Sequence, residues 1–398
     1  MSLTRRKFLS AAICGGLSFF AYPALAKDFF AEFEQSKNNN FNEFESLVQE
    51  RFAELDRMTR AAYANARDKI EPKWGYSEAI LPSATRWVGY DDESNGRIMV
   101  DYERQIVSIE AIVPSGTSKR HEAKWIEELG TKLLDKRTKE QSRMDPVREK
   151  LPRFKENTEK FSVGRENLAD AGSLILKEGL SKNPRTIRQA IRKQGRISKR
   201  PLDSYEQSAE IVSVQIQFDP KVNRLSSEIL KRPVQRYSKK YRIPANLIFA
   251  VIETESAFNP RAISSVPAYG LMQLVPRSGG VDAYEFVFGN KRVVEMEYLF
   301  VPEQNVQLGT AYLHLLNYRY FRKIRDKQTR QHCTIAGYNT GAGNVARALT
   351  GTTSLSKLAK AANKLSPEEV YEQLKTDLPY DETRQYLVKV SDRIGKYS

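Results

Sequence analysis

The chain has 398 residues, of which 64 are lysine or arginine and 49 are aspartate or glutamate, so its formal net charge at pH 7 is +15. Two cysteines and three histidines argue against a disulfide-stapled fold and a histidine/cysteine metal site, and no metal or cofactor is expected. The length suggests two domains with packed cores. The basic charge favours an anionic partner such as nucleic acid, lipid headgroups or an acidic cell-wall polymer.

Residues 1–26 have the features of a bacterial export signal. Arg5 and Arg6 precede a moderately apolar run, and residues 24–26 (Ala-Leu-Ala) form a small-x-small cleavage site before Lys27. Residues 4–9 resemble the twin-arginine pattern, which predicts transport across an inner membrane in the folded state and a soluble periplasmic product. Export argues against nucleic acid as the partner. Membrane association is expected only if the signal stays uncleaved.

Residues 27–220 are expected to form an α+β accessory domain. Up to about residue 67 the apolar residues recur at helical spacing. β-branched and aromatic residues predict four strands, at residues 85–90, 97–102, 105–113 and 209–218. The second and third of these form a hairpin that turns near Glu103 and Arg104.

Two helices are expected between the third and fourth strands. The first is marked by a run of apolar residues, Trp125, Ile126, Leu129, Leu133 and Leu134. The second is the basic stretch RTIRQAIRKQGRISKR, residues 185–200, which is interpreted as the solvated face of a helix; the alternative is a binding patch.

Residues 221–398 are expected to be all helical, because strand signals disappear after Pro220. One helix follows Pro244, and its buried face is formed by Leu247, Ile248, Val251 and Ile252. Glu255 continues that face one turn further on, whereas Glu253 lies about 160° away from Glu255 around the helix. The pair Asn259 and Pro260 ends the helix soon afterwards.

Glu255 is therefore expected at a helix end, beside a cleft or a core. Burial raises the pKa of a carboxyl group, which suits a general acid that works near neutral pH. The alternative on this stretch alone is a buried glutamate neutralised by a neighbouring arginine.

Four sequence blocks resolve this choice. In chain order they are ETESAFNPRAISS, YGLMQLVP, AGYNTGAGNV and ETRQYLVKV. They resemble the four blocks of the lytic transglycosylases with a goose-lysozyme-like fold, which cleave peptidoglycan, and the resemblance covers about residues 222–396. Residues 74–116 resemble the accessory domain of the membrane-bound lytic murein transglycosylase C group. Members of that group are lipoproteins, whereas the signal here resembles the twin-arginine type.

The resemblance implies a peptidoglycan-cleaving enzyme with an all-α lysozyme-like catalytic domain, acting as a monomer on glycan strands. Glu255 would be the sole acid/base, and the orienting and glycan-holding residues would be Ser256, Gln273, Tyr338, Asn339 and Tyr386. Tyr386 would hydrogen-bond the carboxyl group of Glu255. Two glycines stand out: Gly270, which permits close backbone approach, and Gly337, where the family carries alanine. Met272 is expected to fill the core.

The number of carboxylates bears on the reaction type. Most glycosidases use two. No acidic residue occurs from Ser256 to Val281, and Asp282 and Glu285 follow. A single carboxylate suits a reaction without activated water, in which the C6 hydroxyl of the muramic sugar attacks C1 of its own ring to give a 1,6-anhydro product. The alternatives are a hydrolysing lysozyme and an inactive glycan-binding protein.

Overall fold

The computed structural model describes residues 46, 50, 53–135, 144–148, 151, 183–202, 208–218, 220–264 and 266–397. The predicted signal, residues 1–26, lies outside the described residues, as does most of the helix predicted before residue 53. Residues 53–74 are helical. The described residues from 53 onwards belong to one compact unit. No helix among the described residues is long and apolar enough to cross a membrane.

The amino-terminal part contains a five-stranded antiparallel sheet with the strand order β1-β2-β3-β5-β4. The strands are β1 (Arg86–Tyr90), β2 (Gly96–Asp101), β3 (Ile106–Pro114), β4 (Arg196–Leu202) and β5 (Ala209–Gln217). The predicted hairpin is confirmed, because Asp101 pairs with Ile106 at the end of β2 and β3. All four predicted strands are present.

The interpretation of residues 185–200 as a solvated helix face is confirmed for residues 185–194 and wrong for residues 196–200. The stretch divides into α5 (Pro184–Gln194) and the edge strand β4, with Gly195 between them. Most side chains of β4 are exposed, so its sequence lacks the apolar alternation that identifies a half-buried strand. Backbone pairing with β5 makes it a strand, and edge strands commonly carry basic residues and proline.

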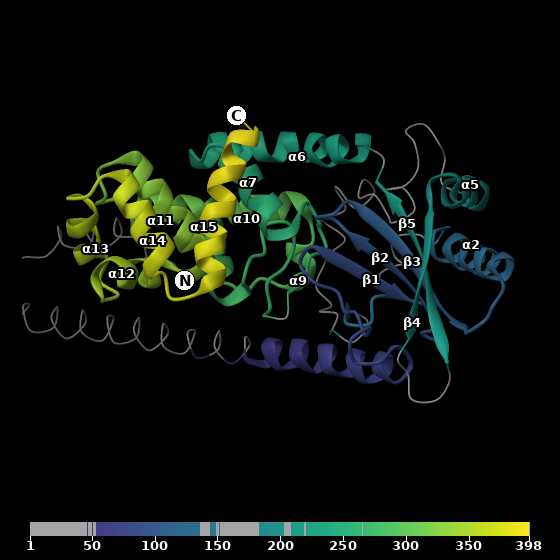
Figure 1. Cartoon of the computed structure of the whole chain (residues 1–398). Coiled ribbons are helices and arrows are strands. Elements are labelled where there is room, and N and C mark those ends of the chain that lie inside the picture. Colours follow the sequence, from purple (N-terminus) through teal and green to yellow (C-terminus); the bar gives the residue numbers. More distant parts are fainter. Residues whose placement is uncertain are drawn as a thin grey trace, which may run out of the picture. The chain divides into compact units, whose positions relative to one another are not determined.

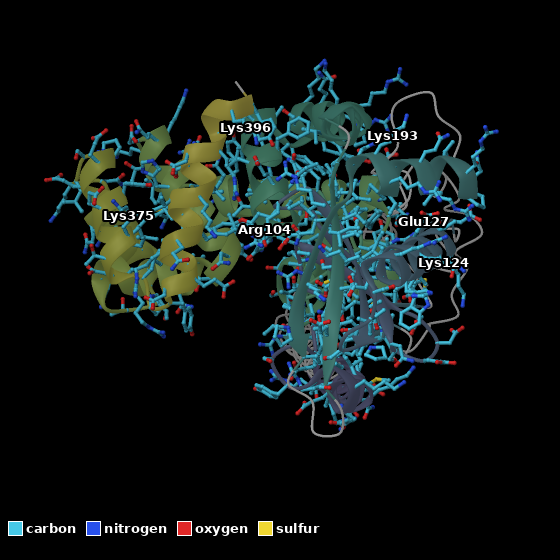
Figure 2. All side chains as sticks on the ribbon, turned by 45° about the vertical axis from the view of Figure 1, so that its right-hand side comes forward. Arg104, Lys124, Glu127, Lys193, Lys375 and Lys396 are labelled. Carbon is cyan, nitrogen blue, oxygen red and sulfur yellow. The ribbon has the colours of Figure 1, made fainter. Side chains whose placement is uncertain are left out.

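Helix α2 (Lys119–Asp135) lies beside α5, and both cover the same face of the sheet (Figure 1). Ile126, Leu133 and Leu134 are buried there as predicted. On the outer side, Glu127 of α2 pairs with Arg188 and Arg192 of α5 at 3.0 and 2.6 Å. Charged side chains such as Lys124, Glu127 and Lys193 cover these two helices (Figure 2).

The described residues from 220 to 397 form helices and turns but no strand, so an α+β part is followed by an all-α part as predicted. The boundary at residue 220 stays a prediction. The longer helices are α6 (Pro220–Tyr241), α7 (Ala245–Ser256), α8 (Val281–Phe288), α10 (Pro302–Leu315), α11 (Lys327–Thr340), α12 (Ala342–Thr350), α13 (Leu355–Ala362), α14 (Pro367–Asp377) and α15 (Asp381–Ile394).

Helix α7 lies in the core of the helical part. The four apolar residues that predicted its buried face are all less than 3% exposed, namely Leu247, Ile248, Val251 and Ile252. The helix ends at Ser256, and Ala257 and Phe258 follow with φ of +48° and +67°. This left-handed turn is rarely adopted by residues other than glycine. Because the helix ends here, Glu255 lies in its last turn, and the residue is only half-buried.

Candidate active site

Glu255 is half-buried in the last turn of α7. The pKa of its carboxyl is raised from 4.5 to about 8, chiefly by burial and in smaller part by the negative charge of Glu382. An interaction with the Tyr386 hydroxyl opposes both by lowering the pKa of Glu255. The Glu255 carboxyl therefore keeps its proton at neutral pH and can donate it.

Tyr386 of α15 faces Glu255, as the family resemblance implies. The Tyr386 ring is buried, and burial together with the Glu255 carboxyl raises the pKa of the Tyr386 hydroxyl. Among the described residues, no group accepts or donates a hydrogen bond of normal geometry at the Tyr386 hydroxyl. Its interaction with Glu255 nevertheless lowers the pKa of Glu255 and raises that of Tyr386. Catalytic hydrogen bonds often shorten only when substrate is bound. Because a buried hydroxyl without a partner is unfavourable, we expect the Tyr386 hydroxyl to form its hydrogen bond with Glu255 in the substrate complex.

Glu382 is a carboxylate that the sequence analysis missed. It lies four residues before Tyr386 in α15, on the same helix face, and its side chain is exposed. Its charge reaches Glu255 and disfavours the ionised form of that carboxyl. The signal that could have revealed it is the i, i+4 spacing to Tyr386 within the block ETRQYLVKV.

The two acidic residues singled out after Val281 do not contribute to the pKa shift of Glu255. Asp282 of α8 accepts a hydrogen bond of 2.9 Å from the hydroxyl of Tyr320. This contact and burial raise the pKa of Tyr320 to about 12. Glu285 is exposed on α8. The acidic residue whose charge reaches Glu255 is Glu382 instead.

The orientation predicted for Glu253 is confirmed. Its carboxylate accepts hydrogen bonds from Lys396 at 2.6 Å and from the Tyr397 hydroxyl at 2.8 Å. Arg393 lies 3.8 Å away. Glu253 therefore ties α7 to the carboxyl-terminal residues.

The turn that carries Gly270 to Gln273 is held by Asn305 of α10, which is fully buried. The Asn305 side chain accepts from Met272 N at 2.8 Å and donates to Tyr269 O and Leu299 O at 2.9 and 2.8 Å. Gly270 has φ of +75°, and a Cβ there would lie 2.2 Å from Leu299 O, so only glycine fits. Sequence reasoning identified Gly270 but missed Asn305, because its partners come from distant positions.

Gln273 sits in this turn with φ of +43° and is 9% exposed. Its side-chain amide donates to Ala262 O at 3.2 Å and to Gly270 O at 3.0 Å. These bonds hold a conformation that is unfavourable for residues other than glycine. They leave the Gln273 Oε1 atom without a bond to any described residue, so it remains an acceptor for a ligand hydroxyl.

Ser256 lies in the interior. Its hydroxyl oxygen is 2.8 Å from Leu271 O and 3.0 Å from Ile252 O, and the side chain has no exposed surface. It therefore joins the end of α7 to the turn at residues 270–273. A direct contact of Ser256 with the sugar stays a prediction.

Tyr338 and Asn339 lie at the end of α11. The Tyr338 hydroxyl donates to Met272 O at 2.8 Å, and the Glu255 carboxyl together with burial raises the pKa of Tyr338. Asn339 accepts from Thr383 of α15 at 2.6 Å, which leaves its amide N–H groups as donors. The structure thus brings Tyr338 and Tyr386 together at Glu255, whereas Asn339 is tied to α15 through Thr383 and Gln273 lies in the turn that Tyr338 holds. Met272 is fully buried, which confirms its place in the core.

Gly337, the departure from the family pattern, is explained by its neighbour Phe321. A Cβ at Gly337 would lie 3.0 Å from a ring carbon of Phe321. Phe321 is buried, so an alanine methyl at position 337 would make a tight contact from which the ring would have to shift slightly. The substitution therefore leaves the packing beside Tyr338 intact.

The helix at residues 53–74 also supports this region. The Tyr63 hydroxyl donates to Pro82 O at 3.1 Å and lies 3.4 Å from Ile263 O. The hydroxyls of Thr59 and Tyr269 are 3.5 Å apart. Asn259 donates to Ala84 O at 3.1 Å. The segment that leads into the Gly270 turn is therefore attached to the amino-terminal part of the chain.

Comparisons with known proteins agree with this geometry. Residues 232–360 match the model of the transglycosylase SLT domain family, and residues 47–134 match that of the membrane-bound lytic murein transglycosylase C amino-terminal domain. The chain is 30% identical over 333 residues to the membrane-bound lytic murein transglycosylase C of Salmonella paratyphi B, covering 83% of this chain and 86% of that protein. It belongs to the membrane-bound lytic murein transglycosylase C family. The family member of Pectobacterium atrosepticum is 29% identical over 340 residues, covering 83% and 87%.

Two solved lytic transglycosylases also show similarity. The enzyme Slt of Pseudomonas aeruginosa is 29% identical, covering 42% of this chain and 23% of that chain, with a TM-score of 0.33. The 70 kDa soluble lytic transglycosylase of Escherichia coli is 26% identical, covering 42% and 24%, also with a TM-score of 0.33. The family assignment rests on the sequence relatives.

Proposed function

We propose that this chain is a lytic transglycosylase that cleaves the β-1,4 bond between N-acetylmuramic acid and N-acetylglucosamine in peptidoglycan without water, releasing 1,6-anhydromuropeptides. Glu255 carries the proposal: its carboxyl has a pKa of about 8 and interacts electrostatically with Tyr386 and Tyr338, in a chain of this family. Such a group is protonated at the start of the reaction and can act as a base in its second half.

In the first half of the reaction, the Glu255 carboxyl gives its proton to the glycosidic oxygen. The bond between that oxygen and C1 of the muramic sugar then breaks, the N-acetylglucosamine end leaves with the proton, and positive charge develops at C1. In the second half, the C6 hydroxyl of the same sugar bonds to C1, and the Glu255 carboxylate takes its proton. One glycosidic bond between two sugars is exchanged for one internal acetal bond between C1 and O6, so no water is consumed and Glu255 regains its proton.

The surrounding residues have separate tasks in this scheme. The Tyr386 hydroxyl stabilises the carboxylate that Glu255 becomes after the first proton transfer, since their interaction lowers the pKa of Glu255. Gln273 Oε1 and the Asn339 amide are the free acceptor and donor for sugar groups. Tyr338 and Ser256 hold the turn at residues 270–273 through backbone carbonyls, so they position the site.

Hydrolysis is the second candidate, because Glu382 supplies another carboxylate near Glu255. Digestion of purified sacculi in heavy-oxygen water, followed by mass spectrometry, separates the two reactions. We expect products ending in 1,6-anhydromuramic acid, about 18 Da lighter than the hydrolysed sugar because one water is absent, with no label incorporated. Label at new muramic ends would show a lysozyme. The Glu255→Gln variant is the control and should release no muropeptides.

The proposed site of action is the periplasm, with export by the twin-arginine signal at residues 1–26 and action as a monomer. Replacing Arg5 and Arg6 with lysine should stop export of the folded protein, as fractionation would show. Export that continues unchanged would indicate a different route.

A further inference from the structure

A row of four aromatic rings lies on the helical part of the chain, apart from the residues around Glu255. It consists of Tyr241 at the end of α6, Phe286 of α8, His314 of α10 and Tyr318 of the short π-helix η4 (Leu316–Tyr320) that follows α10. Successive ring centroids are 6.0, 5.0 and 4.9 Å apart. Tyr241 is buried, whereas Phe286 and Tyr318 are 43% and 38% exposed. The row therefore leads from the core to the surface.

The rings are fixed in place by hydrogen bonds to the backbone. His314 Nδ1 lies 2.8 Å from Tyr241 O, and the Tyr318 hydroxyl donates to Arg242 O at 3.0 Å. Helices α6 and α10, which carry two of the rings, lie side by side (Figure 1). Rigid aromatic side chains can bind a ligand at low cost in conformational entropy.

Two cations stand over rings of the row. Lys240 Nζ is 5.2 Å from the ring centre of Tyr241, and the Arg242 guanidinium is 5.2 Å from that of Tyr318. Both side chains are exposed, and neither forms an ion pair within the part of the chain that the structure describes. Exposed aromatic rings and positive charges without ion-pair partners thus lie side by side. A ligand that fits both would have apolar faces and negative charges.

The row faces away from the proposed catalytic residues. Tyr312 and His314 are two residues apart on α10, which separates their side chains by about 200° around the helix. The Tyr312 ring contacts Tyr338, 5.5 Å between centroids, whereas the His314 ring contacts Phe286. A ligand on the row would therefore not occupy the site around Glu255.

We infer that the aromatic row is a second, non-catalytic binding site for a peptidoglycan strand. Sugar rings have apolar faces that can lie against Phe286 and Tyr318, and the carboxylates of stem peptides can pair with Lys240 and Arg242. The inference rests on the proposed function for the choice of ligand. A site of this kind holds the enzyme on an insoluble polymer while strands enter and leave the catalytic site.

A lipid surface is the competing occupant, and the geometry disfavours it. Helices that bind membranes insert an apolar face about 5 to 10 Å into the headgroup region. More than half of the surface of Phe286 and Tyr318 is covered by protein, and α8 has only eight residues. The rings are thus set into the protein surface and do not form a protruding apolar face.

The experiment compares binding with turnover. Two proteins are compared, and both carry Glu255→Gln so that they cannot digest the sacculi. One has no other change, and the other also carries Phe286→Ala and Tyr318→Ala. Binding of each to purified sacculi is measured by pelleting. We expect about tenfold weaker binding, since two stacking contacts are lost. Turnover of a short soluble muropeptide by the Phe286→Ala/Tyr318→Ala pair in the active enzyme should stay unchanged. Trp125→Ala, which removes a ring of 43% exposure on α2, is the matched control and should bind sacculi normally.

The charges are tested by Lys240→Gln with Arg242→Gln, which should weaken sacculus binding at low salt and flatten its decrease with added salt. Unchanged pelleting of both double variants overturns the inference, as does an equal loss of binding by Trp125→Ala. Loss of binding to vesicles of anionic phospholipid, with sacculus binding intact, identifies a membrane surface instead. The two proposals can also fail separately. If the wild-type enzyme does not turn over sacculi but its pelleting still depends on Phe286 and Tyr318, the proposed function is wrong and the second binding site is supported.

Discussion

The raised pKa of Glu255 predicts that this residue lowers the stability of the protein at alkaline pH. The shift runs from 4.5 to about 8 and is caused first by burial. Below pH 4.5 the carboxyl is protonated in both the folded and the unfolded chain, so it costs nothing. As the pH rises toward 8, the unfolded carboxyl ionises while the folded one keeps its proton, and folding becomes progressively less favourable. Above pH 8 the full penalty is present.

Glu255→Gln removes this penalty, because the amide is neutral at every pH. One pKa unit corresponds to about 1.4 kcal/mol, so the shift amounts to about 4 to 5 kcal/mol. The residue as a whole is only half-buried, so screening by solvent reduces the expected gain to about 2 to 4 kcal/mol at pH 9. The variant should therefore be inactive yet more stable than the wild type at pH 9, with no such gain at pH 4.

The assay is urea unfolding of both proteins at pH 4, 6 and 9, with the difference in midpoints plotted against pH. Glu253→Gln is the matched control, since it changes a glutamate two residues away that is bonded to Lys396 and Tyr397. It should remain active and lose stability at pH 9. A Glu255→Gln gain of the same size at all three values would refute the argument, because a pH-independent effect cannot come from titration of this carboxyl.

Three further predictions concern the neighbours of Glu255. Tyr386→Phe removes the hydroxyl that stabilises the Glu255 carboxylate. We expect the rate to fall roughly tenfold to a hundredfold, which corresponds to about 1.4 to 2.7 kcal/mol of barrier. An unchanged rate would show that Tyr386 only packs in the core. Glu382→Gln removes a like charge and should move the alkaline limit of the pH–rate profile to lower pH; a profile that does not move would exclude the coupling. Asn305→Ala removes three hydrogen bonds and should cost about 2 to 4 kcal/mol of stability together with most activity, whereas retention of full activity would show that the turn at residues 270–273 holds without it.

The sequence alone predicted the parts of the molecule that depend on local periodicity. Helix α7 and its buried face followed from apolar residues at helical spacing, and the opposite directions of Glu253 and Glu255 followed from helix geometry. The hairpin of β2 and β3 followed from its residue types. Edge strand β4 was missed, because backbone pairing with β5 creates it while its side chains remain mostly exposed.

For the site, the sequence predicted Glu255, Gln273, Tyr338, Asn339 and Tyr386 through family blocks, but it could not show the contacts that hold them. That Ser256 is sealed in the interior and that Asn305 fixes the Gly270 turn depend on contacts between residues 15 to 36 positions apart. Glu382 and Glu255 are 127 positions apart in the sequence, and the charge of Glu382 acts on Glu255 only because α15 packs against α7. Periodicity reports only the face of an element to which a side chain belongs. Burial and the neighbouring charges, which set the pKa of Glu255, exist only once the helices have packed.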